Sequence, residues 1–331
     1  MEIIEKGVLP DSRSYEIFRI ITPDTEIPEE IVRYFISSFG FDNHRVAMYG
    51  LAFWRAYFRD SLANAYVPEV VDHHYIMKID GEYAGRLWFG YNTKTLRGNF
   101  GNVYTETAFR NQGVMKYLLR HFQADFAASP ATMLCCESSN PYAVPSYLKC
   151  GFKLIYGGTG GPLALCKNGS FQDVERTVFA GGDQTIIRPG RIGDQFECDK
   201  VLAYSDAVYH FPRHSKFGLG VLINAFQTAY QETLCGNGGI LNVLENESGA
   251  LPAYAFALDF FKEDFMDFRF HLSYMDKIPE LLKRTAAEFT AKTGRQARCI
   301  IGSADTERLE IAARAGLTCV GGIDNVYKIF Q

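Results

Sequence analysis

The stretch from residue 103 to residue 152 constrains this chain most, because its pattern predicts a strand, a glycine turn, a helix, a second strand and a second helix. At its centre the turn R-N-Q-G-V-M, residues 110–115, lies between an apolar strand over 99–107 and an amphipathic helix over 114–127. A glycine turn that opens a helix presents unpaired backbone N–H groups and the positive end of the helix dipole. The pattern therefore predicts a site for a phosphate or pyrophosphate group, with positive charge added by Arg110, Lys116 and Arg120.

A second pattern follows the strand expected over 132–139. It has the form N-x6-Y-x3-G-F and consists of Asn140, Tyr147, Gly151 and Phe152. In this order and spacing, the two patterns resemble two characteristic stretches of the GNAT acyltransferase superfamily, the first of which reads R/Q-x-x-G-x-G/A. Met115 departs from the family pattern, because it stands where the family has a small residue. The backbone donors of the loop survive this change.

Length and composition indicate two globular domains. The chain has 331 residues, and its content of 47% hydrophobic and 14% aromatic residues favours packed cores over disorder. Its net charge of −4 gives no reason to expect nucleic acid or an anionic membrane as a partner. Residues 1–10 lack the apolar core of a signal peptide, and no apolar run approaches the roughly 18 residues that span a bilayer. We therefore expect a cytoplasmic protein.

The cysteines and histidines predict no metal site. Eight cysteines are scattered without a C-x-x-C pair, which is typical of reduced cytoplasmic thiols. His73 and His74 are adjacent on a strand and so point to opposite faces. His210 and His214 have helical spacing, but Pro212 between them argues against a helix there.

The order of expected elements over about residues 14–167 is also that of the GNAT fold, which is α/β (α+β) with a mixed, mostly antiparallel twisted sheet flanked by helices, and we assign residues 1–167 to this domain. The hydrophobic pattern predicts strand 15–21, helices 29–39 and 45–63, strands 74–79, 83–91 and 99–107, helix 114–127, strand 132–139, a helix after Asn140, a strand to Tyr156 and strand 163–166. Residues 168–183 are polar and contain glycine, and we interpret them as a linker.

Residues 184–331 repeat the same order of elements and predict a second GNAT-like domain. The expected elements are strand 185–188, helices 193–209 and 220–234, strands 240–245, 254–260 and 268–272, helix 279–292, strand 297–302, helix 306–315, and strands 319–320 and 326–330. Aligning Gly316 with Gly151 sets an offset of 316 − 151 = 165. The glycine of the loop then becomes Ile278, Pro279 removes a donor, and Glu280 places an anion near the expected pyrophosphate. We therefore expect a degenerate domain that does not bind CoA and serves as a wall or scaffold.

The resemblance implies acetyl-CoA as the acyl donor and assigns roles to matching residues. Tyr147 matches the tyrosine near the CoA sulfur and is the candidate general acid, although it would serve equally as a core tyrosine. Asn140 matches the residue that contacts the pantetheine arm, a role compatible with a helix cap. The expected cofactor-binding residues are Thr105, Thr107, Arg110, Asn111, Gln112, Gly113, Val114, Met115, Asn140 and Tyr147.

Two glutamates are candidates for the general base. Glu137 lies at the end of the strand over 132–139, and Glu106 ends the strand before the loop. Family members use a carboxylate on either strand, and each of these could equally be a solvated charge at a strand end. Cys135, two residues before Glu137, is better interpreted as a small buried residue than as a nucleophile.

These observations predict transfer of an acetyl or other short acyl group from CoA to an amine, by direct attack in a ternary complex. The alternative is a non-catalytic acyl-CoA sensor or scaffold that keeps the loop. The acceptor is a small-molecule or peptide amine of unspecified identity. Neither a metal nor an oligomer is required for this chemistry.

Overall fold

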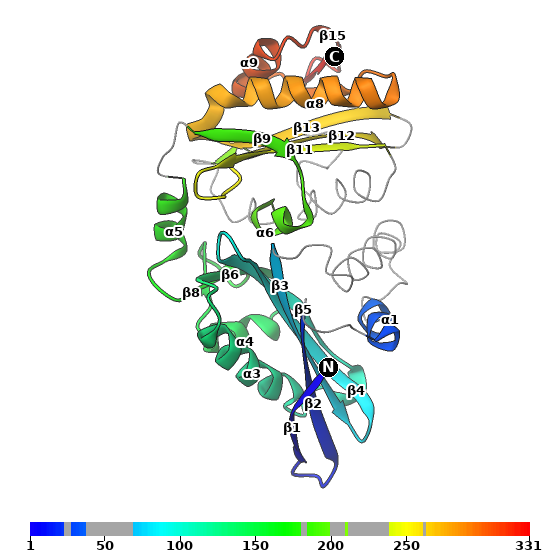
Figure 1. Ribbon diagram of the computed structural model, residues 1–331, viewed down its shortest axis with the longest axis vertical. Coiled ribbons are helices and arrows are strands. Elements are labelled where there is room, and N and C mark those ends of the chain that lie inside the picture. Colours follow the sequence, from blue (N-terminus) through cyan, green and yellow to red (C-terminus); the bar gives the residue numbers. More distant parts are fainter. Residues whose placement is uncertain (23–27, 38–68, 180–183, 199–208, 211–237, 261–262) are drawn as a thin grey trace. The chain divides into compact units, whose positions relative to one another are not determined.

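The computed structural model describes residues 1–22, 28–37, 69–179, 184–198, 209–210, 238–260 and 263–331 (Figure 1). The chain divides into two compact units, Met1–Val174 and Glu175–Gln331. The division falls inside the segment 168–183 that we interpreted as a linker. That segment contains a short helix, α5 (Phe171–Val178).

The first unit is built on an eight-stranded sheet with the order β1-β2-β3-β4-β5-β6-β8-β7. Neighbouring strands are antiparallel except for β5 and β6, which are parallel. The strands are β1 (Glu2–Val8), β2 (Ser14–Thr22), β3 (Val70–Ile79), β4 (Glu82–Asn92), β5 (Arg97–Thr105), β6 (Met133–Ser138), β7 (Lys153–Leu154) and β8 (Gly161–Cys166).

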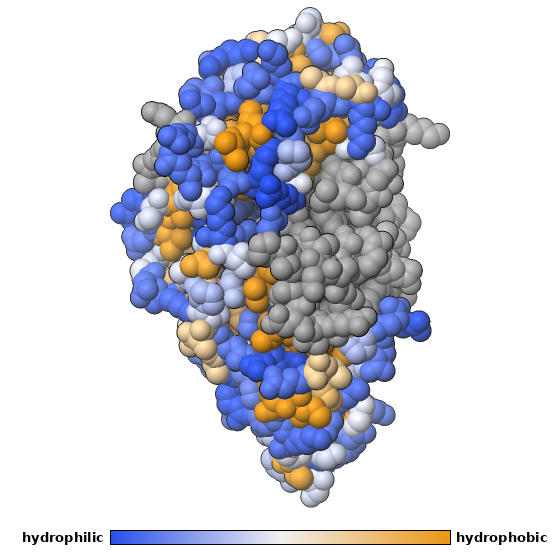
Figure 2. Space-filling view, viewed as in Figure 1, coloured by the Kyte–Doolittle hydropathy of each residue, from blue (hydrophilic) through white to orange (hydrophobic). Residues whose placement is uncertain are grey.

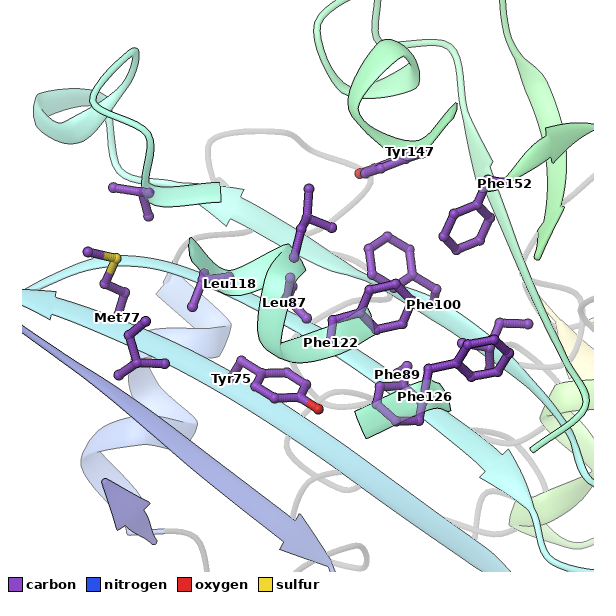
Figure 3. Close-up of a cluster of buried hydrophobic side chains, with 14 of the residues drawn as sticks. Tyr75, Met77, Leu87, Phe89, Phe100, Leu118, Phe122, Phe126, Tyr147 and Phe152 are labelled. Atoms are coloured by element: carbon purple, nitrogen blue, oxygen red, sulfur yellow. The ribbon is translucent and has the colours of Figure 1, made fainter. Parts of the chain in front are cut away.

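Helices cover both faces of this sheet. In Figure 1, α3 (Val114–Ala128) and α4 (Ala143–Lys149) lie on one side of it and α1 (Glu29–Ser37) on the other. Eight consecutive residues of β4 are buried, as expected of a central strand packed on both faces. On α3, apolar residues with helical spacing, such as Leu118, Phe122 and Phe126, face the core. Figure 3 shows this core, in which the ring of Phe122 lies 4.7 Å from that of Phe100 and 5.5 Å from that of Phe89.

The parallel strands β5 and β6 separate after a short paired stretch. They pair only from Arg97–Met133 to Asn99–Cys135. Beyond that point β5 stays paired with β4 as far as Thr105, and β6 stays paired with β8 as far as Ser138. The sheet therefore opens between the ends of β5 and β6.

The second unit repeats this architecture. Its sheet has the order β15-β16-β14-β13-β12-β11-β9, again with a single parallel pair, β13 and β14, along that path. The strands are β9 (Thr185–Pro189), β11 (Ile240–Asn246), β12 (Ala253–Phe260), β13 (Glu263–His271), β14 (Arg298–Gly302), β15 (Cys319–Ile323) and β16 (Tyr327–Phe330), and β10 (Tyr209–His210) pairs with β13. In Figure 1, α8 (Ile278–Thr293) and α9 (Thr306–Arg314) lie on one side of this sheet, and α6 (Gln195–Cys198) lies on the other.

The positions of β6 and β14 follow the sequence offset. The first residue of the parallel pairing in β6 is Met133, and the corresponding residue of β14 is Arg298, which gives 298 − 133 = 165. The structure thus confirms the predicted fold class, with two mixed, mostly antiparallel sheets flanked by helices.

The structure also differs from the sequence-based expectation. Strand β1 was not predicted, because it is an edge strand with mostly exposed or half-exposed residues and shows no clear alternation. Strand β13 begins at Glu263, five residues before the expected start at 268. The helices expected over 45–63 and 220–234, and most of that expected over 193–209, lie outside the described residues.

The unpredicted strand β1 is tied to the rest of its unit by Glu5. Its carboxylate accepts hydrogen bonds from Tyr15 at 2.5 Å, from His121 at 2.6 Å and from Arg120. Burial alone would raise the pKa of Glu5, but these hydrogen bonds lower it from 4.5 to about 2. The contribution of Glu5 to stability is therefore present above about pH 4.5 and is lost as pH falls towards 2.

We expect Glu5→Gln to lower the free energy of unfolding near neutral pH, and this difference from wild type to shrink as the solution is acidified. Urea unfolding between about pH 7 and pH 3 measures this. Glu16→Gln is the control, because Glu16 pairs with Lys6 at the exposed surface of the same hairpin. A difference for Glu5→Gln that stays constant down to the lowest pH would contradict this account of the pKa.

On the face shown in Figure 2, the described hydrophobic residues lie in separate patches between hydrophilic ones. The most exposed large hydrophobic residue is Tyr142, at 88%, among those that the structure describes. No described helix is both long enough and apolar enough to cross a membrane.

Candidate active site

A cavity of about 870 Å³ occupies the opening between β5 and β6. Its walls come from the end of β5, the loop that opens α3, the end of β6 and the start of α4. The lining residues are Phe100, Gly101, Asn102, Val103, Tyr104, Thr105, Phe109, Arg110, Asn111, Gly113, Val114, Met115, Lys116, Cys136, Glu137, Ser138, Asn140, Tyr142, Ala143, Ser146 and Tyr147. The two sequence patterns that lie more than twenty residues apart therefore form one site.

The loop that opens α3 presents a run of free backbone donors. Asn111 and Gly113 both have positive φ angles, 62° and 80°, which turn the backbone sharply before the helix begins at Val114. No hydrogen bond among the described residues uses the N–H groups of residues 111 to 115. Five consecutive N–H groups at the positive end of a helix form a strong site for an anion such as a pyrophosphate.

Most of the predicted cofactor-binding residues line this cavity. Of the ten, only Thr107 and Gln112 do not, because Thr107 begins the short 3-10 helix η1 (Thr107–Phe109) and Gln112 bonds to the backbone of that helix instead. Met115 both lines the cavity and packs partly buried against the hydrophobic core. A large side chain at this position therefore has a place in the core and leaves the backbone donors exposed.

Tyr147 presents its hydroxyl group to the cavity. The residue is 6% exposed, and its ring packs 5.2 Å from Phe100 and 6.0 Å from Phe152, as Figure 3 shows. The described residues give its hydroxyl no hydrogen-bond partner. Burial, together with Cys136 and Cys150, raises the pKa of Tyr147 well above its ordinary value. Tyr147 is thus a protonated donor at neutral pH with an available O–H group.

Glu137 is the candidate base that lines the cavity. It lies on β6 next to Cys136, and loss of water around its carboxyl group raises the pKa of Glu137 above the ordinary value. A raised pKa brings a carboxylate closer to the pKa that suits a general base. The cysteine beside it in the wall is Cys136, whereas Cys135 is buried and does not line the cavity. Burial raises the pKa of Cys136 strongly, so its thiol is not an activated nucleophile.

Glu106 does not line this cavity. It precedes η1, and its backbone N–H donates to Ala84. Its charge acts on Arg86, a fully buried residue whose guanidinium lies 5.1 Å from the ring of Phe35 in α1. Burial lowers the pKa of Arg86 to about 10 against the opposing effects of Tyr34, Tyr104 and Glu106. The two glutamates thus have different surroundings. Glu137 lines the cavity together with Tyr147, and Glu106 does not.

Asn140 shapes the entry to α4. Its side-chain oxygen accepts a hydrogen bond from the N–H of Tyr142 at 2.9 Å, and its backbone oxygen accepts from Ala143 and Val144. This is the local turn that an asparagine ahead of a helix commonly makes. The side-chain oxygen is used within the chain, and the side-chain amide group makes no hydrogen bond among the described residues.

Sequence reasoning missed several residues of the cavity wall. Asn102, Tyr104, Tyr142 and Ser146 line it, and none of them is a defining residue of either pattern. Tyr142 lies inside the second pattern at a variable position, so nothing in its spacing marks it. Only the tertiary arrangement of β5 and α4 around the cavity brings these residues together.

The equivalent region of the second unit is built differently. A 3-10 helix, η5 (Leu272–Lys277), runs into α8, and Lys277 has an ordinary helical conformation with φ −88° and ψ −18°. The N–H of Ile278 is used by the carbonyl of Met275. The loop therefore lacks both the glycine and the left-handed turn that expose the donors in the first unit.

A buried ion pair occupies the second unit beside its parallel strands. With the offset of 165, Arg308 of α9 corresponds to Ala143, which lines the cavity of the first unit (308 − 165 = 143). The Arg308 side chain is 1% exposed, pairs with Asp267 of β13, and lies 3.9 Å above the ring of Phe268. Asp305 adds a second carboxylate at 3.9 Å from the Arg308 Nε atom. A large charged side chain thus packs against β13 at the position where the first unit has a small alanine.

The described residues contain no group of three or more His, Cys, Asp or Glu side chains placed to hold a metal ion. His73 stacks on Phe89 at 4.3 Å, and His74 lies 5.3 Å from Phe35 of α1, so the two rings face opposite sides of β3. Burial lowers the pKa of His73 to about 4 and that of His74 to about 3, which keeps both neutral at pH 7.

The residues of this site fall within a segment that matches a known protein family. Residues 30–152 match the model of the Acetyltransferase (GNAT) family. A search of curated proteins found no match. The matched residues include the loop, β6, Tyr147 and Phe152, and therefore span the whole cavity wall described above.

Several solved structures are similar to part of the chain. Nourseothricin acetyltransferase is 19% identical over 30% of this chain and 66% of that chain, with a TM-score of 0.25. The PaiA N-acetyltransferase from Thermoplasma acidophilum, in complex with coenzyme A, is 12% identical over 45% of this chain and 99% of that chain, with a TM-score of 0.30. YncA from Salmonella typhimurium, with its cofactor acetyl-CoA, is 18% identical over 44% of this chain and 90% of that chain, with a TM-score of 0.33.

Proposed function

Because the chain carries a domain of the Acetyltransferase (GNAT) family at residues 30–152, we propose that its first unit transfers an acetyl or another short acyl group from CoA to an amine. The single observation that supports this most is the row of N–H groups at residues 111 to 115, which make no hydrogen bond among the described residues, while residues 111, 113, 114 and 115 line the same cavity as Tyr147. One end of the cavity suits a pyrophosphate, and the other holds a proton donor. In CoA, the pantetheine arm joins the pyrophosphate to the thiol.

The donor would bind along the cavity from the loop towards Tyr147. The pyrophosphate would accept hydrogen bonds from the N–H groups of residues 111 to 115, with Arg110 and Lys116 in the wall supplying positive charge. The side-chain amide of Asn140 would bind the pantetheine arm. The thioester carbonyl would lie against the end of β5 near Thr105, where β5 has already left β6.

The chemistry needs one proton removed and one supplied. The amine loses a proton, its nitrogen forms a bond to the thioester carbon, and the C–S bond breaks with its electron pair leaving on sulfur. Glu137 would accept the proton of the amine, directly or through water. Tyr147 would donate its proton to the departing thiolate. Glu106 is the second choice for the base, because it does not line the cavity.

The second unit, in this proposal, binds no CoA and acts as a scaffold. It lacks the glycine turn, and Arg308 is packed against β13 where the first unit has only a small side chain in its cavity wall. The domains would thus divide into a catalytic part, residues 1–167, a linker, residues 168–183, and a degenerate part, residues 184–331. The acceptor would be a small-molecule or peptide amine.

We expect Tyr147→Phe to lower kcat by about a hundredfold and to leave the Kd for acetyl-CoA nearly unchanged, because it removes the proton donor but keeps the ring. The measurement is release of free CoA thiol in the presence of a panel of amines, alongside calorimetric titration with acetyl-CoA. Tyr91→Phe is the matched control, since Tyr91 is a buried tyrosine of β4 that does not line the cavity.

Two results would count against the proposal. Full activity of Tyr147→Phe would remove Tyr147 from the chemistry. Tight binding of acetyl-CoA by the wild type without turnover on any amine would instead favour the non-catalytic sensor or scaffold.

A further inference from the structure

We infer that Arg13, which lies outside the matched family domain, is a positioning residue that holds the phosphate-binding loop in shape through the side chain of Gln112. The inference rests on the proposed use of acyl-CoA by the first unit. It assigns a function to the turn between β1 and β2, a part of the chain that neither sequence pattern includes.

The loop needs support from outside its own backbone. Gln112 lies between two residues with positive φ angles, Asn111 and Gly113, a conformation that a non-glycine residue such as Asn111 adopts at a cost. The N–H groups of residues 111 to 115 make no hydrogen bond among the described residues. Side-chain hydrogen bonds therefore contribute to holding this backbone in place.

Gln112 supplies such a connection with both ends of its amide group. Its Nε2 atom donates to the backbone oxygen of Ala108 at 2.8 Å. Its Oε1 atom accepts from Nη2 of Arg13 at 2.5 Å, across 99 positions of sequence. The side chain therefore links η1, which precedes the loop, to the β1–β2 turn.

Arg13 is itself held firmly. Asp11 accepts hydrogen bonds from its Nε and Nη2 atoms at 2.9 and 2.5 Å, and Leu9 and Arg13 close the turn with an N–H to O bond of 2.8 Å. The Arg13 guanidinium also lies 5.8 Å from the ring of Phe109, a buried residue of η1. The hydrogen bond that Arg13 donates to Asp11 raises the pKa of Arg13. The guanidinium thus contacts Asp11, Gln112 and Phe109 at once.

The positions of these two side chains indicate that they support the loop and do not contact the acyl donor. Arg13 and Gln112 are both absent from the wall of the cavity, although Arg110, Asn111 and Gly113 around them belong to it. Arg13 would therefore act on the donor only through the shape of the loop. Its loss should weaken binding of acetyl-CoA and raise the KM for it, without changing kcat.

The test compares Arg13→Met, Gln112→Ala and the double variant by calorimetric titration with acetyl-CoA and by steady-state kinetics. We expect each single change to raise the Kd for acetyl-CoA about fivefold, and the double variant to be no weaker than either single one. The KM for the amine and kcat should stay unchanged. Lys6→Met is the control, because Lys6 is an exposed cation of the same hairpin that pairs with Glu16.

Arg13→Lys tests whether the positive charge of Arg13 or the geometry of its hydrogen bonds supports the loop. Lysine keeps the positive charge but cannot bind Asp11 and Gln112 with one rigid fork. We expect it to bind acetyl-CoA nearly as weakly as Arg13→Met does. Wild-type affinity in Arg13→Lys, or effects of Arg13→Met and Gln112→Ala that add in the double variant, would overturn the inference, since either result would indicate a simple electrostatic contribution from Arg13.

A readout on the ligand-free protein keeps the inference separate from the proposed function. The backbone amide resonances of residues 111 to 115 should shift in the same way in Arg13→Met and Gln112→Ala, and should not shift in Lys6→Met. Absence of acetyl-CoA binding by the wild type would refute the proposed function, while these resonances would still decide whether Arg13 shapes the loop. Unchanged resonances in Arg13→Met would refute the inference.

Discussion

Gly113→Asp is expected to abolish binding of acetyl-CoA, raising its Kd by more than about a hundredfold. Gly113 has a φ of 80°, so any side chain there is strained. An aspartate at this position also places a negative charge among the N–H groups that would hold the pyrophosphate. The strain and the charge repulsion act in the same direction, and calorimetric titration with acetyl-CoA measures their sum.

Gly81→Asp is the matched control for Gly113→Asp. Gly81 has a φ of 84° in the turn between β3 and β4, and no atom lies within 4 Å of a Cβ built there. It therefore experiences the same backbone strain and the same added charge at a place remote from the cavity. If Gly81→Asp weakens binding as much as Gly113→Asp does, the effect is one of folding and not of the loop.

The same titration tests the second unit. One binding site in the wild type, lost in Gly113→Asp, is the expected outcome, because Lys277 and Ile278 form ordinary helix where the first unit has its left-handed turn. Two sites would mean that the second unit binds CoA in spite of Pro279 and Glu280.

Arg308→Met is expected to lower the free energy of unfolding by about 3 kcal/mol. Arg308 is 1% exposed and is the closest partner of Asp267, which is 3% exposed. Among the described residues, removing the guanidinium leaves the carboxylate of Asp267 buried with Arg269, at 3.7 Å, as its remaining charged partner. A buried charge that has lost its closest partner destabilises the fold by more than the intact pair contributed to stability. Urea unfolding near neutral pH measures the change.

Arg314→Met is the matched control for Arg308→Met. Arg314 lies on the same helix, α9, and pairs with Glu310 at 3.6 Å, but both side chains are about half exposed. The substitution should change the free energy of unfolding by less than about 0.5 kcal/mol. Equal effects of the two substitutions would show that the pair of Arg308 with Asp267 is not the source of the difference.

Arg308→Met also tests whether the second unit affects the binding of acetyl-CoA. The Kd for acetyl-CoA should be unaffected by Arg308→Met at temperatures where the protein stays folded, because the described residues that line the cavity all belong to the first unit. A change in affinity would indicate that the second unit influences the site.

Local features of the site could be predicted from the sequence. The turn at Gly113 and the start of α3 at Val114 depend on residues that are neighbours in the chain, so a short pattern contains the information. The repeat was visible for the same reason, since the offset of 165 read from Gly151 and Gly316 recurs in the pairing of β6 and β14. The hairpin at Asp80-Gly81 likewise joins two strands that are adjacent in sequence.

Features that depend on distant residues could not be predicted. Strand β1 has mostly exposed or half-exposed side chains, so its place at the sheet edge is set by pairing with β2 and by the bonds of Glu5 to Arg120 and His121. The sequence did not rank Glu137 over Glu106, because both end a strand in the one-dimensional pattern. The separation of β5 from β6 decides which carboxylate enters the cavity wall.

By itself, the sequence determined most of the order of elements, the internal repeat and the glycine turn that opens α3, because each depends on spacing along the chain. The tertiary structure alone decided which side chains from distant elements contact one another. It brought Arg13 to Gln112 over 99 positions and placed Arg308 beside Asp267. Such contacts depend on how strands and helices pack, and no local pattern of residues encodes that packing.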